Sequence, residues 1–152
     1  MPPLALPLLL ISLLAADNSV YQVVAPVDAP LNDISMDELR RIFLMRRLFW
    51  KPGHPIRLVL PGSGRPTREF MLARVCQKTE GEYRRLVLEV LYRGDTDQPP
   101  KVGASDGDIL KLLATERESL GLVATGADLL PGLKVLRIDG RLPTEPGYPL
   151  VP

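Results

Sequence analysis

A short loop rich in glycine holds the residues of this chain that are best suited to binding chemistry. Residues 62–65 follow an apolar run at 56–60, and they include Ser63, Gly64 and Arg65, with Thr67 just beyond. Glycine lets a backbone approach an anion closely, hydroxyl groups donate hydrogen bonds, and a guanidinium from Arg65 or Arg68 neutralises charge. We therefore predict an oxyanion site formed by Ser63, Gly64, Arg65 and Thr67.

The same loop also has a purely structural interpretation. Ser63 or Arg65 could cap a helix that begins at Pro66, while the glycines form a tight turn. The Gly-Lys-Ser/Thr ending of a P-loop is absent, and Gly-x-Ser-x-Gly does not occur, so neither a P-loop nor a nucleophile elbow is present. On local evidence alone, the capping interpretation is preferred.

The few reactive side chains do not indicate an enzyme. The chain has one histidine, His54, in a Pro/Gly turn, and one cysteine, Cys76, on the apolar face of a predicted helix. Nothing in the sequence brings the two together as a nucleophile and its base. There is no His/Cys cluster with metal-ligand spacing, and no cofactor is predicted. Cys76 is expected to be a small buried residue.

Composition narrows the remaining function classes. The chain has 152 residues, a formal net charge of +1 and 45% hydrophobic residues, which suit one domain with a real core. A nearly neutral chain is not a general polyanion binder. Nucleic acid is not an expected partner, because aromatic residues are few and no basic run alternates with them.

The first residues predict an exported protein. Residues 4–16 are uncharged and rich in leucine, but they are too short to span a bilayer, which takes about 20 residues. We predict a signal peptide over 1–16, cleaved near Ala15 or Ala16, a domain over 17–152, and a periplasmic location. The signal is atypical because no Lys or Arg precedes the apolar segment. A hydrophobic first strand or helix is the alternative.

The rest of the chain alternates predicted strands and helices. Strands are predicted at 21–25, 56–60, 120–124 and 133–138, and helices at 66–78 and 82–91. Two more helices are predicted to begin at serine caps: one after Ser35, with Phe43 on its apolar face, and one after Ser105. Ser35 with Glu38 forms a capping-box pattern, and the proline-rich tail from Gly140 is expected to run over the surface. This alternation predicts an α/β domain with a mixed or mainly parallel sheet. Ligands in such sheets lie beyond the carboxyl ends of strands, where residues 62–65 are found.

A set of individually weak motifs extends along nearly the whole chain after residue 16. They are SMDELRRIF from Ser35 with Trp50, Ser63-Gly64 before a helix with Phe70, Tyr92-Arg93-Gly94, SDGDILKLL from Ser105, Gly121-Leu122-Val123, Ile138-Asp139-Gly140 and Gly147-Tyr148-Pro149-Leu150. In this order they resemble the phosphate-binding family of periplasmic solute-binding proteins of ABC transporters, in particular its short single-lobe relatives.

The resemblance implies one lobe of a type 2 periplasmic-binding fold, with a central mixed sheet flanked by helices and an oxyanion as ligand. The family's Ser-Gly-Thr anion loop falls on Ser63 and Gly64, with Arg65 in the threonine position. The family's arginine and aspartate that precede this loop and contact phosphate fall on Val59 and Pro61. The resemblance therefore implies an oxyanion ligand, with Arg65 as the candidate to replace the family's arginine and no residue in place of its aspartate.

Length separates two hypotheses of function. A two-lobed receptor needs about twice this chain, at the usual ~100–200 residues per domain. A single lobe cannot enclose an ion from both sides, so binding is expected to be weak unless a protein partner or a second copy supplies the other wall. The first hypothesis is a small exported protein that binds phosphate or a related oxyanion. The alternative is a ligand-free module for interaction, assembly or envelope signalling.

Overall fold

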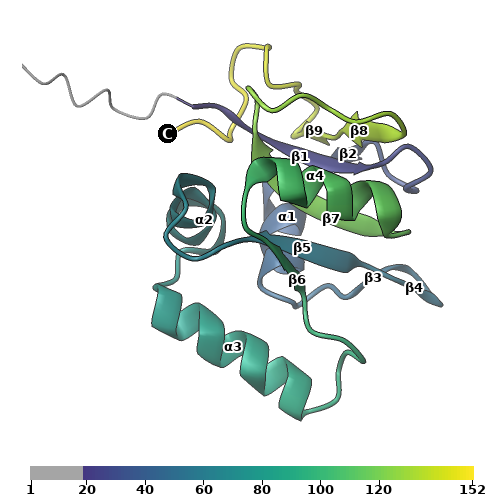
Figure 1. Cartoon of the computed structure of the whole chain (residues 1–152), viewed down its shortest axis with the longest axis vertical. Helices are drawn as coiled ribbons and strands as arrows, with labels where there is room; N and C mark the ends of the chain where they lie inside the picture. The colour runs from purple at the N-terminus through teal and green to yellow at the C-terminus, as the bar shows by residue number, and fades with distance from the viewer. Residues whose placement is uncertain (1–18) are drawn as a thin grey trace, which may run out of the picture.

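A five-stranded mixed sheet forms the centre of the molecule, with helices on both faces (Figure 1). The structure, a computed structural model, describes residues 19–152, so the predicted signal peptide lies outside the described residues. In sheet order, the strands are β6 (Lys101–Gly103), β5 (Arg57–Pro61), β7 (Ser119–Ala124), β1 (Tyr21–Pro26) and β8 (Leu133–Val135). The first three run parallel, and β1 is antiparallel to both of its neighbours, which confirms the prediction of a mixed sheet.

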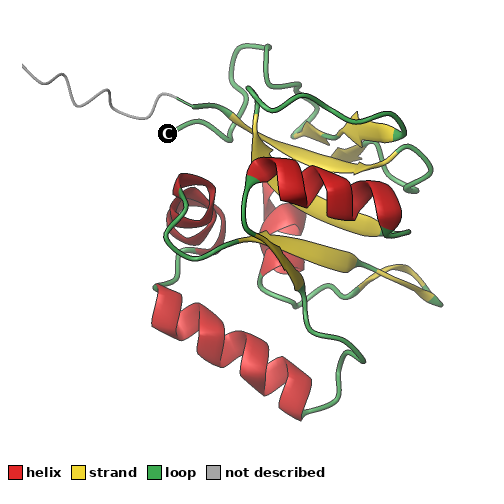
Figure 2. Cartoon of the chain, in the orientation of Figure 1, coloured by secondary structure: helices red, strands yellow, loops and turns green. Residues whose placement is uncertain are grey.

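Alternating residues of the central strands build two separate cores. On β5, Leu58 and Leu60 enter the larger core, while Val59 points to the other face and packs under α4 (Asp106–Thr115). The two layers are seen on either side of the sheet in Figure 2, with α4 in front and α1 (Met36–Phe43) behind. This alternation follows from the two-residue repeat of a strand, since successive side chains point to opposite faces.

Helix starts are set by local capping. Ser35 Oγ accepts a hydrogen bond from the Glu38 amide at 3.1 Å, so the predicted cap of α1 is confirmed. Helix α3 (Glu80–Tyr92) begins before the predicted residue 82, because Thr79 and Glu82 form a reciprocal capping box that sequence reasoning missed. Among residues 19–152, no helix combines the length and the apolar character needed to cross a membrane.

The predicted helix at 66–78 changes its geometry along its length. It begins as α2 (Pro66–Phe70), continues as the π-helical segment η1 (Met71–Cys76), and ends at Gln77, whose φ is 54°. Cys76 is buried, as predicted, and desolvation raises the pKa of its thiol to about 12. The thiol is therefore protonated at neutral pH and is a poor nucleophile.

One predicted strand differs from the structure, and a predicted turn, which is confirmed, belongs to a hairpin that was not predicted. The strand predicted at 133–138 is interrupted at Leu136, and β9 (Arg137–Ile138) pairs in parallel with β2 (Asp33–Ile34) in a separate two-stranded sheet. The turn near residue 53 closes a short hairpin of β3 (Phe49–Lys51) and β4 (His54–Pro55). Neither pairing could be predicted, because β2 and β9 lie far apart in the chain and β3 and β4 are too short to leave a periodic pattern.

The prediction of a surface tail is confirmed for most residues from Gly140 onward, which are exposed or half-buried, but two residues of the tail enter the core. Tyr148 and Leu150 are buried in the larger core. The Tyr148 hydroxyl donates to the Tyr21 carbonyl at 2.8 Å, and the Tyr21 amide donates to the Leu150 carbonyl at 3.0 Å. Two apolar side chains spaced two residues apart thus attach the tail to the first strand despite its prolines.

Candidate anion-binding site

The candidate loop lies where the carboxyl ends of three parallel strands meet. Residues 62–65 leave the end of β5, and the Gly62 amide donates to the Gly103 carbonyl of β6 at 3.0 Å. Gly64 has a φ of +77°, a conformation that favours glycine, and the Arg65 amide donates back to the Gly62 carbonyl at 3.3 Å. The predicted tight glycine turn is therefore present at a sheet edge where ligands bind in open α/β folds.

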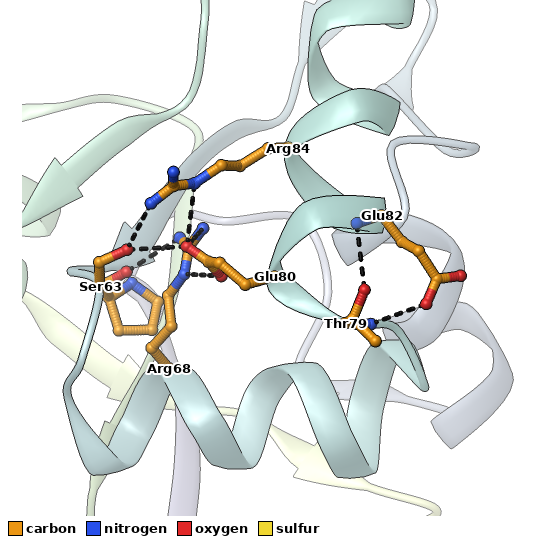
Figure 3. Close-up of polar contacts among 7 residues, drawn as sticks. Ser63, Arg68, Thr79, Glu80, Glu82 and Arg84 are labelled. Carbon is orange, nitrogen blue, oxygen red and sulfur yellow. Dashed lines mark hydrogen bonds and ion pairs between the residues drawn. The ribbon is translucent and has the colours of Figure 1, made fainter.

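Ser63 points toward the first turn of α3, as Figure 3 shows. Its hydroxyl donates to Glu80 Oε1 at 2.7 Å and accepts from Arg84 Nη2 at 3.0 Å. Arg84 Nε also donates to Glu80 Oε1, at 3.2 Å. The predicted anion-binding hydroxyl thus already contacts a carboxylate of the same chain.

Arg68 is the cation at the centre of this cluster. Its side chain is only 9% exposed, and its Nε and Nη2 donate to the two oxygens of Glu80, both at 3.0 Å (Figure 3). Its Nη1 donates to the carbonyl of Pro61 at 3.1 Å, and its guanidinium lies 5.5 Å from the centre of the Tyr83 ring. This two-point contact with a carboxylate is among the strongest polar interactions available to arginine.

Arg65 was expected to contact an anion or to cap the next helix, but its side chain turns to another part of the fold. It occupies the N-cap of α2, but its side chain makes no capping hydrogen bond. Instead, its Nε donates to the Ala104 carbonyl, in the connection from β6 to α4, at 2.6 Å. Because Ser63 bonds to α3 and Arg65 to this connection, the hypothesis that either side chain caps α2 is wrong. Arg65 itself remains exposed.

Thr67 is buried and belongs to a polar bridge across the strand ends. Its hydroxyl donates to Asp106 Oδ1 at 3.1 Å, and the Ala124 amide donates to Asp106 Oδ2 at 3.0 Å. The bridge joins α2, the start of α4 and the end of β7. The hydroxyl predicted to bind a ligand therefore has a structural partner 39 residues away.

We expect Asp106→Ala to lower the free energy of unfolding by about 1.5–3 kcal/mol, the range for hydrogen bonds to a charged group. The variant leaves the Thr67 hydroxyl and the Ala124 amide without their acceptor. Asp108→Ala is the matched control, because Asp108 is exposed and lies in the same first turn of α4. Urea denaturation of both variants measures the difference. Equal losses would show that the bridge adds nothing beyond the helix-dipole contribution of an acidic residue.

The charge of Glu80 is maintained by its surroundings. Desolvation raises the pKa of its carboxyl, but hydrogen bonds from Arg68 and Ser63, with the charges of Arg68 and Arg84, outweigh it and leave the pKa below its ordinary value. A lowered pKa means that the ionised group stabilises the fold fully above the ordinary glutamate pKa. This stabilisation is lost as the pH falls through the lowered value.

The two positions where the family has phosphate-contacting residues carry none here. Val59 is 1% exposed and packs under α4, so a charged side chain at this position would enter an apolar core. Pro61 contributes only its carbonyl, which Arg68 bonds. Arg68 thus brings a guanidinium to the loop from the following helix. The sequence analysis missed that Arg68 and Ser63 both bond to Glu80, because no local pattern links Glu80 to either residue.

The site residues divide into two groups. Ser63 bonds to the α3 side, with Arg68 and Arg84, whereas Arg65 and Thr67 bond to the β6–α4 side, and Gly64 forms the turn between them. The first group carries one hydroxyl and two guanidinium groups, the donor types that suit an oxyanion. Within residues 19–152 there is no group of three or more His, Cys, Asp or Glu side chains placed to hold a metal ion.

Comparison with known proteins places the fold. No family model and no curated protein matches the chain. PstS from Borrelia burgdorferi superimposes with a TM-score of 0.71 at 16% identity, over 88% of this chain and 54% of that one. A protein described as a phosphate ABC transporter substrate-binding protein from Clostridium perfringens, solved with bound phosphate, gives a TM-score of 0.66 at 15% identity, over 83% and 47% of the two chains.

A third solved structure agrees with these two. An ABC-type phosphate transport receptor from Vibrio cholerae gives a TM-score of 0.63 at 16% identity, over 83% of this chain and 48% of that one. The chain therefore spans about half the length of each of these proteins. At such low identity the similarity establishes the fold alone: the chain has the α/β periplasmic-binding fold of phosphate ABC transporter substrate-binding proteins, over the length of a single lobe.

Proposed function

We propose that this chain is an exported solute-binding-like protein that binds phosphate or a related oxyanion weakly at residues 62–65. The observation that carries the proposal is the convergence of the Ser63 hydroxyl with the guanidinium groups of Arg68 and Arg84 on one carboxylate. Hydroxyl and guanidinium donors that stabilise a carboxylate have the chemistry to stabilise a phosphate oxygen as well. The fold shared with phosphate receptors supports the same ligand class.

The expected affinity is low, for a structural reason. The loop lies at the surface, with Ser63, Gly64 and Arg65 all exposed, and the chain spans about half of a two-lobed receptor. An ion bound here keeps water on one side, so its hydrogen bonds compete with solvent. A Kd of about 1 mM, equivalent to about −4 kcal/mol, is a reasonable expectation.

Calorimetric titration of the purified chain with inorganic phosphate at low ionic strength tests this proposal. We expect saturable heat from the native chain and binding weakened about tenfold or more in Arg84→Ala, since one charge-assisted hydrogen bond contributes about 1.5–3 kcal/mol. Ser63→Ala and Arg65→Ala test the predicted loop residues in the same way. Arg85→Ala is the matched control, because Arg85 is an exposed neighbour on the same helix.

Two outcomes would contradict the proposal. One is equal binding by the native chain, Arg84→Ala, Ser63→Ala and Arg65→Ala, which would place the ion elsewhere. The other is an absence of heat at millimolar phosphate. That second outcome would favour the alternative of a ligand-free interaction module. The replacement of the phosphate-contacting positions by Val59 and Pro61 is the observation that supports this alternative.

A further inference from the structure

The carboxylate of Glu80 occupies the point on which the donors of the candidate site converge. Four hydrogen bonds reach it, from Ser63 Oγ at 2.7 Å, from Arg68 Nε and Nη2 at 3.0 Å each, and from Arg84 Nε at 3.2 Å. Figure 3 shows the three donor side chains arriving from the loop, from α2 and from α3. This is the contact set expected for a bound oxyanion, made here by a side chain of the protein.

The cluster is built around this carboxylate rather than assembled by chance at the surface. Arg68 is 9% exposed, and its remaining donor contact is to the Pro61 carbonyl, so it depends on Glu80 for charge neutralisation. Arg84 adds a second positive charge, which leaves two guanidinium groups against a single carboxylate. The excess charge matches an anion that carries more than one negative charge, such as phosphate at neutral pH.

We propose that Glu80 is an internal ligand of the loop, and that its carboxylate competes with phosphate for Ser63, Arg68 and Arg84. This inference rests on the proposed oxyanion-binding function and adds a control on the same site. Glu80 is able to leave, because its side chain is 33% exposed and it stands at the first position of α3. An external anion that replaces it must supply the charge that Arg68 then lacks.

Competition of this kind sets the apparent affinity of the site. The apparent Kd equals the intrinsic Kd divided by the fraction of molecules in which the site is free. If Glu80 is displaced in about one molecule in a hundred, phosphate binds about a hundredfold more weakly than the empty site would bind it. Low affinity would then have two causes: competition from Glu80, and the absence of a second lobe over the bound ion.

Glu80→Gln tests the inference, because glutamine keeps the length and one acceptor oxygen but removes the charge. We expect phosphate to bind at least about tenfold more tightly to this variant than to the native chain. Without phosphate, the variant should melt at a lower temperature, since Arg68 loses its counter-charge. Phosphate should then raise its melting temperature more than it raises that of the native chain.

Glu89→Gln is the matched control, since Glu89 is exposed on the same helix and its change alters the net charge equally. Tighter binding in Glu80→Gln but not in Glu89→Gln supports the inference. Equal or weaker binding in Glu80→Gln, with binding retained by the native chain, overturns it and leaves the proposed function intact. Binding by neither protein overturns both. Binding by Glu80→Gln alone supports the internal ligand but contradicts the proposed binding of phosphate by the native chain.

Discussion

Gly103→Ala is expected to lower the free energy of unfolding by about 2–3 kcal/mol, the upper range for overpacking a core. A Cβ atom at this position would lie 2.5 Å from Ile109 Cγ1 and 2.9 Å from the Ile109 amide nitrogen. Ile109 is a buried residue of α4, so relief of the contact requires the helix to move away from β6. Urea denaturation measures the loss.

The effect should extend to the candidate loop. The Gly103 carbonyl accepts from the Gly62 amide at 3.0 Å, so a displaced β6 shifts the first residue of the loop. We therefore expect weaker phosphate binding in Gly103→Ala than in the native chain. Gly107→Ala is the control: its Cβ would meet only Ser105 Oγ, at 3.7 Å, and alanine in a helix is favoured over glycine by about 0.5–1 kcal/mol. Native stability in Gly103→Ala would show that α4 does not pack this closely on β6.

Tyr83→Ala is expected to have the largest effect on stability, a loss of about 3–5 kcal/mol, as is usual when a buried aromatic residue is replaced with alanine. Tyr83 is fully buried, and with Val90 it supplies the buried residues of α3, the helix that lies apart from the sheet in Figure 1. Its hydroxyl donates to the Phe43 carbonyl of α1 at 2.8 Å. The variant therefore removes the main attachment of α3, and with it the position of Glu80.

Two further variants separate the contributions of this tyrosine. Tyr83→Phe keeps the ring but leaves the Phe43 carbonyl without its donor, which costs about 1–3 kcal/mol. Tyr92→Ala makes the same truncation at a side chain that is 94% exposed on the same helix, and it should change stability by less than about 0.5 kcal/mol. Urea denaturation orders the three variants, and hydrogen exchange reports detachment of α3. A loss in Tyr83→Ala as small as that in Tyr92→Ala would contradict the attachment.

Local signals in the sequence accounted for the order of the elements and for the glycine turn. Ser35 and Ser105 capped helices where they were expected to, because an N-cap requires only a hydroxyl and an amide three residues on. The apolar runs at 21–25, 56–60 and 120–124 became central strands, since burial on both faces leaves a continuous hydrophobic pattern. These features depend on neighbours within a few residues.

The tertiary structure alone decided which polar groups meet. Arg68 bonds to Glu80, from which it is separated in sequence by η1 and the cap of α3. Thr67 bonds to Asp106, which follows β6 in the chain. The end of β8 at Val135 likewise depends on a distant segment, because the Arg137 amide donates to the Asn32 carbonyl at 2.8 Å and β9 pairs with β2. The sequence by itself determined an α/β chain with an anion-suited loop, because those properties are local. Whether the loop is open or already bound to Glu80 was decided by hydrogen bonds between distant segments, which leave no periodic or compositional pattern.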